Sequence, residues 1–513
     1  MRIGIDVGGT NTDAVIMDGR SIVAHAKRPT TPDVSGGIIS VLKTVLREAN
    51  IPPSEIQAVM IGTTHFTNAV VERKRLLSVG IIRLALPATK CLPPMCDWPH
   101  DLSSALGKHS YLVRGGFNFD GRVIAPLDEA AVAAAAKDIK KKGLKTAAIT
   151  SVFSPVNQDM EERGAEILLQ EIPDIEVTLS HQIGRIGFLE RENATVMNAC
   201  LAELAKVVVD SFRTALSELK IEAPFYVSQN DGTLMTSDYV EKYPVLTFAS
   251  GPTNSMRGAV FLAGLKDAMV VDIGGTTSDI GMLIKGFPRE SSVAVDIGGV
   301  RTNFRMPDVL AIGLGGGSII RNEGANVGPD SVGFKLTEEA LVFGGQTLTA
   351  TDIAVAAGLA QIGEPKKVAH LNPKFVNAAL DRIHDMIDTA VDRMRTSAEP
   401  LPIILVGGGS ILISRNIPSA SEVTKPDYAP VANAIGAAIA QVGGEVERMF
   451  SLDAISRDEA LDQAKQEAVS KTIDAGAREE TVSVVDIEEV MISYLPGNAT
   501  RIRVKAAGDL AMS

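Results

Sequence analysis

Short apolar runs alternate along this chain with longer segments of helical periodicity. Apolar, often β-branched residues predict buried strands at 2–5, 58–61, 146–152, 177–180 and 269–271. Apolar residues spaced three and four apart predict helices at 35–49, 127–143, 157–171 and 193–219. Asp128 stands where it would cap the second of these helices. Strands that alternate with helices indicate an α/β fold.

Two regions depart from this alternation. Residues 91–120 contain Pro, Gly and His without a clear period, which predicts an irregular insertion. Near the end of the chain, 457–478 reads as a charged helix, followed by alternating runs at 481–494 and 499–506. We therefore expect residues 451–513 to form an appended helix and β-hairpin.

Composition narrows the class of protein. The chain has 513 residues, 45% of them hydrophobic, which is enough for at least two domains. Its net charge is -12 without a long basic run, so nucleic acid is not an expected partner. Cys91, Cys96 and Cys200 give neither a disulfide framework nor metal-ligand spacing, which is typical of the reducing cytoplasm. The chain opens on strand residues, and it has no run of about 18 uncharged apolar residues, so neither a signal peptide nor a membrane span is expected.

One pattern occurs twice. Residues 6–13 read Asp-Val-Gly-Gly-Thr-Asn-Thr-Asp, and residues 272–279 read Asp-Ile-Gly-Gly-Thr-Thr-Ser-Asp. Each copy lies between two apolar runs, which predicts a strand, a glycine turn and a returning strand. Glycine lets backbone N–H groups approach phosphate oxygens, and threonine hydroxyls can donate to the same oxygens. Two copies predict duplicated halves that close on one nucleotide.

The repeated pattern supplies the first candidate site residues. A carboxylate at a strand end can hold hydrated Mg²⁺, which makes Asp6 and Asp272 the predicted metal ligands. Asp13 and Asp279 are also repeated, but we expect them to hydrogen-bond their own turns. The predicted phosphate contacts are Gly8, Gly9, Thr10, Asn11, Thr12, Gly274, Gly275, Thr276 and Thr277.

These turns resemble the phosphate-1 and phosphate-2 loops of the actin, sugar kinase and Hsp70-like ATPases. Residues 402–410, a buried strand that runs into three glycines, resemble the adenosine loop of that superfamily, and 431–440 resembles its second connecting helix. The resemblance implies ATP and Mg²⁺ bound in the cleft of a two-lobed actin-like ATPase (ribonuclease H-like) fold with duplicated β-sheet cores. Further implied nucleotide contacts are Gly407, Gly408, Gly409 and Asn433. The implied parts are a first lobe over 1–190, a second lobe over 191–430, and a helix returning to the first lobe over 431–450.

Two other glycine-rich segments need an interpretation. Residues 296–300 read Asp-Ile-Gly-Gly-Val, without the threonine, and we interpret them as a strand-end turn. Residues 311–318 read Ala-Ile-Gly-Leu-Gly-Gly-Gly-Ser, which is either a plain flexible loop or a loop of the nucleotide or substrate cleft. The second interpretation makes Gly315 and Gly316 candidate nucleotide contacts.

Within the superfamily, nearly the whole chain resembles the hydantoinase/oxoprolinase family, and specifically its ATP-binding A-type subunit. Residues 4–13 are similar to the family pattern GxDxGGTFTD, with Asn11 in place of the usual Phe. Residues 61–69 resemble its GTTxxTNA segment, and 348–352 resemble its TxTDA segment. Residues 229–232 together with 250–252 resemble its SNGG…SGP region.

This resemblance implies an ATP-dependent hydrolase, or its ATP-binding subunit, that opens a cyclic amide such as a hydantoin, 5-oxoproline or another lactam. Amide resonance makes the carbonyl a poor electrophile, and phosphorylation of the amide oxygen turns that oxygen into a leaving group and lets water attack. The residues place and neutralise the γ-phosphoryl group, with Asp272 and Thr276 near the in-line path. The implied partners are a small cyclic amide and a second, B-type subunit or further copies of the chain.

His65 follows Gly62-Thr63-Thr64 at a predicted strand end that faces the cleft. A histidine there can act as a general base near neutral pH, and a surface or packing role is the alternative. Arg185 and residues 190–193 form a polar cluster, either in contact with substrate or as a solvated helix start.

Two other functions use the same loops. A small-molecule kinase needs a base toward an alcohol acceptor, and Asp231 is the candidate. A chaperone or reactivating ATPase uses ATP to move a partner protein. The segments 61–69 and 229–252 favour the cyclic amide hydrolase over both.

Overall fold

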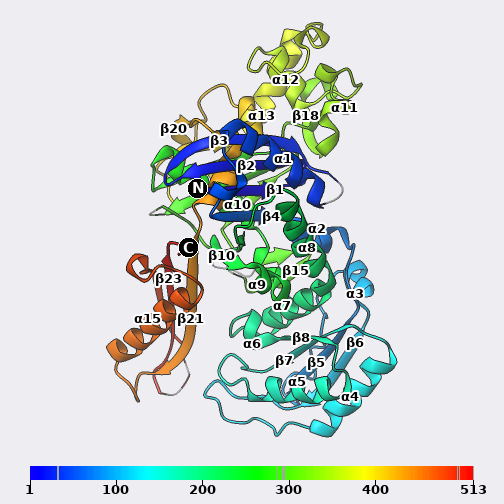
Figure 1. Ribbon diagram of the computed structural model, residues 1–513, viewed down its shortest axis with the longest axis vertical. Helices are drawn as coiled ribbons and strands as arrows, with labels where there is room; N and C mark the ends of the chain where they lie inside the picture. Colours follow the sequence, from blue (N-terminus) through cyan, green and yellow to red (C-terminus); the bar gives the residue numbers. More distant parts are fainter. Residues whose placement is uncertain are drawn as a thin grey trace.

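Two β-sheets with the same internal strand order lie at the centre of the molecule (Figure 1). The computed structural model describes residues 1–31, 34–284, 286–291, 295–304, 306–493, 495 and 497–511. In the first sheet the order β3-β2-β1-β4-β9 continues through β10, β21 and β23 to β22. The strands are β1 (Arg2–Val7), β2 (Asn11–Asp18), β3 (Ser21–Pro29), β4 (Ala58–Thr63), β9 (Phe225–Ser228), β10 (Thr233–Thr236), β21 (Gln441–Ser451), β22 (Ser483–Met491) and β23 (Ala499–Gly508).

The second sheet repeats this plan in the order β13-β12-β11-β19-β20, with β16 also paired to β12. In both sheets the first central strand pairs antiparallel with the next strand in the chain and parallel with a later one. This is the duplicated ribonuclease H-like arrangement that the resemblance to actin-like ATPases implied, and the α/β prediction is confirmed. The strands are β11 (Ala268–Ile273), β12 (Ser278–Ile284), β13 (Phe287–Pro288), β16 (Val309–Ile312), β19 (Leu401–Val406) and β20 (Ala420–Thr424).

A four-stranded parallel sheet and two small hairpins complete the β structure that the described residues show. The parallel sheet has the order β6-β5-β7-β8 and extends below the first sheet in Figure 1. The strands are β5 (Val79–Leu86), β6 (His109–Arg114), β7 (Thr146–Ser151), β8 (Glu176–Leu179), β14 (Val295–Ile297), β15 (Val300–Thr302), β17 (Ser318–Arg321) and β18 (Asn326–Ser331).

Each sheet has its own buried core, because apolar helix faces pack on it. The core of the first sheet includes Ile3, Ile5 and Val59, and that of the second includes Val271, Ile383 and Leu405. The longer helices are α1 (Val34–Ala49), α4 (Glu129–Lys141), α5 (Asp159–Glu171), α7 (Phe188–Cys200), α8 (Ala202–Glu218), α10 (Ser250–Ala263), α13 (Pro373–Met394) and α15 (Arg457–Asp474). The shorter helices are α2 (His65–Glu72), α3 (His100–Leu106), α6 (Ser180–Ile183), α9 (Ser237–Lys242), α11 (Leu336–Glu339), α12 (Ala350–Ala356) and α14 (Ala432–Ala438).

Helices α10 and α14 cross closely between the two sheets because glycines stand at the crossing. A Cβ on Gly258 would lie 2.0 Å from the carbonyl oxygen of Ala432, and one on Gly436 would lie 1.8 Å from that of Asn254. A Cβ on Gly4 of β1 would lie 2.0 Å from the carbonyl oxygen of Ala434. Small residues therefore bring α14 down onto β1, next to the end of that strand.

Several elements differ from the sequence expectation. Residues 91–120 contain α3 and β6, so the expectation of an irregular insertion is wrong there, because two short elements with Pro and Gly between them show no long period. The single helix expected over 193–219 is broken at Leu201 into α7 and α8. The helix expected over 431–450 ends at Ala438, and β21 follows it. Asp128 caps α4 as expected, by accepting a hydrogen bond from the backbone N–H of Ala131.

The end of the chain is part of the first sheet, not a separate hairpin. β21 pairs in parallel with β10 and antiparallel with β23, and α15 packs on this extension. In Figure 1 the extension projects at the lower left, in orange and red. Residues 495–498, which join the two runs of the expected hairpin, lie partly outside the described residues. The lobe boundaries near 190 and 430 stay a prediction. Among the described helices none is long and apolar enough to cross a membrane.

Candidate functional site

The glycine turn between β1 and β2, which we call turn 1, spans residues 8–11. The N–H of Gly8 donates to the carbonyl of Asn11 at 3.1 Å, and Asp6 and Asp13 stand opposite each other where the strands meet the turn. Thr30, the residue after β3, supports the turn because its hydroxyl donates a hydrogen bond to Gly8 O at 2.8 Å. The same hydroxyl lies 3.2 Å from that of Thr12, which is fully buried. Turn 1 is therefore fixed from within its own sheet.

Turn 2, residues 274–277, repeats this geometry between β11 and β12. The N–H of Gly274 donates to the carbonyl of Thr277 at 2.9 Å, and Asp272 stands opposite Asp279. Thr276 and Thr277 are both exposed, whereas their counterparts Thr10 and Asn11 in turn 1 are half-buried. Turn 2 thus presents two free-standing hydroxyl side chains at the surface.

The two turns face each other. A Cβ on Gly275 would lie 3.1 Å from the Oγ1 of Thr10 and 3.2 Å from its Cγ2, so the tip of turn 2 touches the side chain of turn 1. A Cβ on Gly9, the equivalent of Gly275, would meet no atom within 4 Å. Two phosphate-binding turns in contact can surround one anion with N–H groups from both sheets.

Four carboxylates cluster behind these turns. Burial, followed by the neighbouring Asp13, raises the pKa of Asp6 to about 7. Burial and then Asp272 raise the pKa of Asp279 to about 7, and burial also raises the pKa of Asp13 and of Asp272. Lys27 lies 2.7 Å from Asp13 and offsets part of this charge. So many carboxylates repel an approaching triphosphate unless a cation lies between them.

The oxygen atoms around Asp6 fit a hydrated Mg²⁺. The Oδ1 atoms of Asp6 and Asn254 are buried and make no hydrogen bond with any described residue, while Asp6 Oδ2 accepts one from the Nδ2 of Asn433 at 3.3 Å. A Cβ on Gly62 would lie 2.7 Å from Asn254 Nδ2 and 2.8 Å from Asp6 Oδ1, so these side chains meet over the end of β4. In the described part of the chain no three His, Cys, Asp or Glu residues form a metal cage. Mg²⁺ does not need one, because it keeps several waters and is bound by one or two carboxylates together with phosphates.

The glycines of 315–317 support turn 2 with their backbone. Gly316 N–H donates to Gly274 O at 3.0 Å, and Gly317 N–H donates to Gly275 O at 2.7 Å. The N–H of Gly315 is bound to the hydroxyl of Ser318 at 2.8 Å. These N–H groups are therefore already engaged, and a role for Gly315 and Gly316 in nucleotide contact stays a prediction.

The loop after β19 lies against turn 2. A Cβ on Gly407 would lie 2.2 Å from Asp272 Oδ1, and one on Gly409 would lie 2.9 Å from Gly274 O. Gly408 is exposed, and a Cβ on it would meet no atom within 4 Å, so it is the member of the three that a ligand can approach. The expected proximity of this loop to turn 2 thus follows from packing that only glycine allows.

His65 begins α2 at the end of β4, where the sequence places it. Its Nδ1 lies 2.6 Å from the hydroxyl of Thr63. Burial and then the charge of Arg75 lower the pKa of His65 to about 4. The side chain is therefore neutral at physiological pH and only weakly basic.

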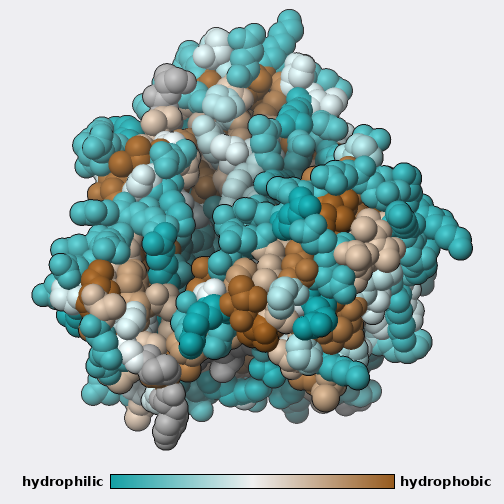
Figure 2. All heavy atoms as spheres, turned by 90° about the horizontal axis from the view of Figure 1, so that it is seen from below, coloured by the Kyte–Doolittle hydropathy of each residue, from teal (hydrophilic) through white to brown (hydrophobic). Residues whose placement is uncertain are grey.

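A second polar region lies beside the turns. Cavities of about 810 and 930 Å³ share several lining residues: Arg185, Asn230, Asp231, Asn303, Phe304 and Glu447. Seen from below, the molecule is hollowed near its middle, with polar residues around the hollow (Figure 2). No residue of turn 1 or turn 2 lines either cavity. The walls come from the loop after β9, from the segment before α7 and from β21 and β23.

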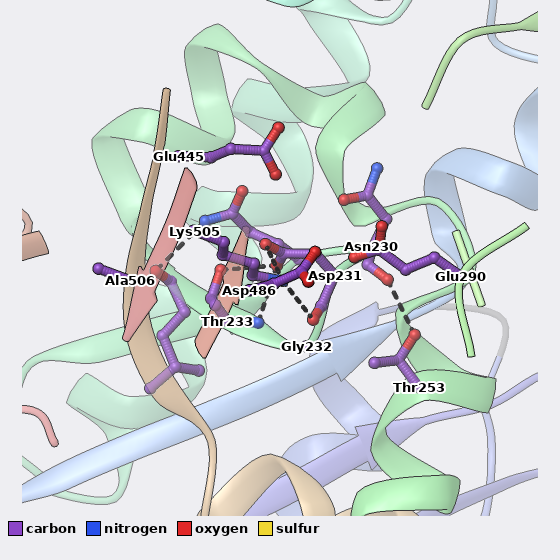
Figure 3. A network of polar contacts seen from close by, with 12 residues as sticks. Asn230, Asp231, Gly232, Thr233, Thr253, Glu290, Glu445, Asp486, Lys505 and Ala506 are labelled. Carbon is purple, nitrogen blue, oxygen red and sulfur yellow. Dashed lines mark hydrogen bonds and ion pairs between the residues drawn. The ribbon is translucent and has the colours of Figure 1, made fainter. Parts of the chain in front are cut away.

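The loop after β9 carries the polar network drawn in Figure 3. Lys505 of β23 lies 2.9 Å from Asp231 Oδ2, and Asp231 Oδ1 accepts from the N–H of Thr233 at 2.9 Å. Burial raises the pKa of Asp231, but the charge of Lys505 and the hydrogen bonds to the carboxylate outweigh this effect and hold the pKa at about 2. In the same region burial raises the pKa of Glu445 to about 7.

Residues 191–193 of the polar cluster at the start of α7 are buried, so the interpretation as a solvated helix start is wrong for them, while Arg185 and Glu190 are half-buried. Glu192 forms a buried ion pair with Arg83, and Asn193 accepts a hydrogen bond from Trp98 at 2.8 Å. Arg191 donates to the carbonyl of Arg185 at 2.6 Å and fixes the segment that lines the cavities. Burial lowers the pKa of Arg191 to about 10.

Residues 296–300 form the hairpin turn between β14 and β15, with Gly299 N–H bound to Asp296 at 2.7 Å.

The structure brings together turn 1, turn 2, Asp6, Asp272 and Asn433, as the sequence predicted. Thr12 lies near them but is buried, and Asn11 closes turn 1 with its carbonyl. Sequence reasoning missed Lys27, Asn254 and Lys505. Neither Lys27 nor Lys505 carries a signal in the sequence, because each is one charge among many on a strand. Asn254 is next to the Ser250-Gly251-Pro252 segment, which is the one available hint.

The chain matches known proteins over most of its length. A family model described as the hydantoinase/oxoprolinase N-terminal region matches residues 2–172, and the hydantoinase/oxoprolinase model matches residues 191–393. Caprolactamase subunit alpha from Pseudomonas jessenii is 30% identical over 388 residues, which are 70% of this chain and 54% of that protein. The chain spans about half the length of several curated relatives that it matches.

Two solved structures share the fold. The ATP-dependent caprolactamase from Pseudomonas jessenii superposes with a TM-score of 0.76 at 21% identity, covering 99% of this chain and 87% of that one. Nucleotide-free acetone carboxylase superposes with a TM-score of 0.73 at 18% identity, covering 100% of this chain and 88% of that one.

Proposed function

The chain belongs to the hydantoinase/oxoprolinase family, and from this premise we propose that it binds MgATP between turn 1 and turn 2 and uses it to open a cyclic amide. The contact between Gly275 and Thr10 supports this most directly. A triphosphate at that contact meets N–H groups and hydroxyls from both lobes at once. The similarity to caprolactamase subunit alpha and to the ATP-dependent caprolactamase supports a lactam as substrate.

We propose Asp6 and Asp272 as the Mg²⁺ ligands, directly or through water. When bound, Mg²⁺ supplies the positive charge that offsets repulsion between the carboxylates and the phosphates. Asn433 orients Asp6 through its hydrogen bond, and the unpaired Oδ1 of Asp6 is left for the metal or its water. Backbone N–H groups of both turns and the hydroxyls of Thr10, Thr276 and Thr277 hold the phosphate oxygens. Gly408 approaches the adenosine.

The reaction follows from the electronic structure of the amide. The ring amide oxygen attacks the γ-phosphorus, ADP leaves, and the ring nitrogen loses its proton. Water then adds to the activated carbon, the C–N bond breaks with protonation of the amine, and a second water releases phosphate from the acyl phosphate. One lactam, one ATP and two waters give an open-chain amino acid, ADP and phosphate. The turns serve the first step by positioning and charge neutralisation.

The attack of water on the activated carbon needs a proton acceptor. His65 remains the candidate on this chain, as a weak base with a pKa of about 4. The relative with 30% identity is named a subunit, and this chain spans 54% of its length. We propose that a second subunit or a further copy of the chain completes the hydrolytic half of the site. The exposed free thiols of Cys91 and Cys96 are consistent with a cytoplasmic location.

The kinase alternative loses its expected base. Asp231 pairs with Lys505 and has a pKa of about 2, so it does not accept a proton from an alcohol near neutral pH. No observation in the described part of the chain favours a chaperone or reactivating ATPase.

Phosphate release and ring opening, measured together, test the proposal. Purified chain with MgATP is incubated with five-, six- and seven-membered lactams, hydantoin and 5-oxoproline, and products are identified by mass spectrometry. We expect one ring to stimulate phosphate release with an open-chain product, alone or with a co-expressed second subunit. A stable phosphorylated product would indicate a kinase, and stimulation by a protein alone would indicate a reactivating ATPase.

A further inference from the structure

The end of β9 stands level with the end of β1 in the first sheet. Asp6 pairs with Gly62 across β1 and β4, and Ile61 pairs with Val227 across β4 and β9, so Ser228 follows in the row of Asp6. Two strand spacings separate the ends by about 10 Å. Asn230 comes two residues after Ser228, as Gly8 comes two residues after Asp6. The loop that carries Asn230 thus leaves the same sheet edge as turn 1, with the end of β4 between them.

The backbone of this loop is held on all sides. Asn230 N–H donates to Leu246 O at 2.7 Å, and Asn230 O accepts from the hydroxyl of Thr253 at 2.9 Å. Gly232, at φ +82°, donates its N–H to Gln229 O at 3.1 Å. The Asp231 side chain is fixed by Thr233 and by Lys505 (Figure 3). The loop is therefore rigid before any ligand binds.

Unlike the backbone of its loop, the side-chain amide of Asn230 is not held by hydrogen bonds. The residue is only 6% exposed, it lines both cavities, and none of the described residues makes a hydrogen bond to its carboxamide. The carboxamide lines the cavities without a partner among the described residues, so both its donor and its acceptor are available to a ligand. The free donor and acceptor point to a polar ligand in the cavity.

The charged groups of the cavity walls favour a neutral ligand. Every described Arg and Lys that lines either cavity is already ion-paired with a carboxylate. These residues are Arg185, Arg289, Arg448, Lys471, Arg501, Arg503 and Lys505. An anionic ligand would also face the carboxylates of these pairs, most of which line the same cavities, whereas a neutral amide can pair with the free carboxamide of Asn230.

A lactam matches this carboxamide in geometry. A small ring holds its amide bond cis, so that its N–H and C=O lie along one edge. A primary carboxamide also presents N–H and C=O along one edge, and the two edges can pair through two parallel hydrogen bonds. An open-chain secondary amide is trans, with N–H and C=O on opposite sides, and the cis form is costly.

We propose that Asn230 binds the ring of a neutral cyclic amide in this cavity by pairing with both its N–H and its C=O. The inference rests on the proposed function and adds to it the residue that recognises the ring and selects the cis amide. Lys505 is a positioning residue, because it holds the loop through Asp231 and does not itself contact the ring.

Calorimetric titration of lactams into the chain, saturated with Mg²⁺ and a non-hydrolysable ATP analogue, tests this. The probes are 2-pyrrolidinone, 2-piperidinone and the seven-membered lactam, with N-methyl-2-pyrrolidinone and open-chain N-methylacetamide as comparisons. We expect at least one lactam to bind and both comparison amides to bind about tenfold or more weakly, because each lacks one of the paired hydrogen bonds. Asn230→Asp and Asn230→Leu each weaken lactam binding about tenfold or more.

Nucleotide affinity separates this inference from the proposed function. We expect it to stay within twofold in both Asn230 variants, which also reports that they fold. Asn326→Asp, the same change at an exposed strand residue outside both cavities, leaves lactam binding unchanged. Lactam binding that is unaffected in both Asn230 variants, equal binding of the N-methylated ring, or nucleotide binding without any lactam binding would overturn the inference. Failure of the wild-type chain to bind the nucleotide would instead contradict the proposed function.

Discussion

Turn 1 and turn 2 have the same backbone and different surroundings. In each, the first glycine N–H binds the fourth carbonyl, at 3.1 Å in turn 1 and 2.9 Å in turn 2. Asp13 of turn 1 pairs with Lys27, whereas no described cation pairs with Asp279 of turn 2. Thr30 supports turn 1 from its own sheet, and the backbone of residues 316 and 317 supports turn 2.

The two halves of the molecule therefore share the turn itself but not the residues that surround it. The turn is a local structure, so glycine and threonine at the right spacing reproduce it in both halves. The partners of each turn come from elsewhere in the chain and have diverged. Thr276 and Thr277 are exposed, whereas their counterparts in turn 1, Thr10 and Asn11, are half-buried. Equivalent positions in the two turns therefore need not have equal roles.

The largest expected difference is in ATP turnover, between variants of the two carboxylates that flank turn 2, Asp272 and Asp279. Asp272→Asn lowers ATP turnover roughly 100-fold or more, because it removes a charge that places the metal and the γ-phosphoryl group. Asp279→Asn, one strand away, lowers turnover less than about tenfold. Steady-state phosphate release measures both, and circular dichroism confirms that both variants fold. Equal losses in the two variants would contradict the assignment of Asp272.

The second contrast concerns stability. Lys27→Met leaves Asp13 buried without its partner, and we expect it to lower the free energy of unfolding by roughly 1–3 kcal/mol. Asp279→Asn is expected to raise the free energy of unfolding, because it removes a buried carboxylate whose pKa is raised to about 7. Urea unfolding at pH 8 measures both. If Asp279→Asn instead lowers the free energy of unfolding as Lys27→Met does, Asp279 has a cationic partner of its own in solution.

The parts of this site that the sequence predicted are those made by neighbouring residues. Two runs of apolar residues around Gly-Gly-Thr determine a strand, a turn and a strand, and Asp128 caps its own helix. The buried strand before Gly407 was predicted in the same way. In each case the interacting residues lie within about ten positions of one another, so local pattern is enough.

Contacts between distant segments could not be predicted. Nothing in the alternating pattern of β23 shows that Lys505 pairs with Asp231, 274 residues away. The charge of Glu192 allowed the interpretation as a solvated helix start, because its burial against Arg83 depends on the position of two separate elements. The same holds for the pairing of β10 with β21, which makes the tail part of the first sheet.

A third contrast tests the contact between the turns. Gly275→Ala places a methyl group 3.1 Å from Thr10 Oγ1, so the turns must separate, and we expect nucleotide affinity to fall about tenfold. Gly9→Ala, at the equivalent position of turn 1, meets no atom within 4 Å and changes affinity less. Adding Thr10→Ser to Gly275→Ala removes the Cγ2 contact and restores part of the affinity. Fluorescence titration with a labelled nucleotide follows all three, and the absence of any rescue would place the clash elsewhere.

The smallest effect is a dependence on pH that reports the carboxylate cluster as a whole. In the folded chain the pKa values of Asp6 and Asp279 are raised to about 7, above their unfolded values near 4. The folded state therefore holds protons that the unfolded state releases, so the stability of the unliganded chain falls as the pH rises from about 4 to about 7.

Mg²⁺ competes with those protons, so we expect the affinity for Mg²⁺ and ADP to rise a few-fold between pH 6 and pH 8, with proton release on binding. Titration calorimetry in buffers of different ionisation enthalpy measures the released protons. Asp6→Asn should abolish most of the pH dependence together with metal affinity, whereas Asp279→Asn should reduce only the pH dependence. That separation would show that Asp6 is a metal ligand and that Asp279, the unpaired carboxylate after turn 2, contributes only charge.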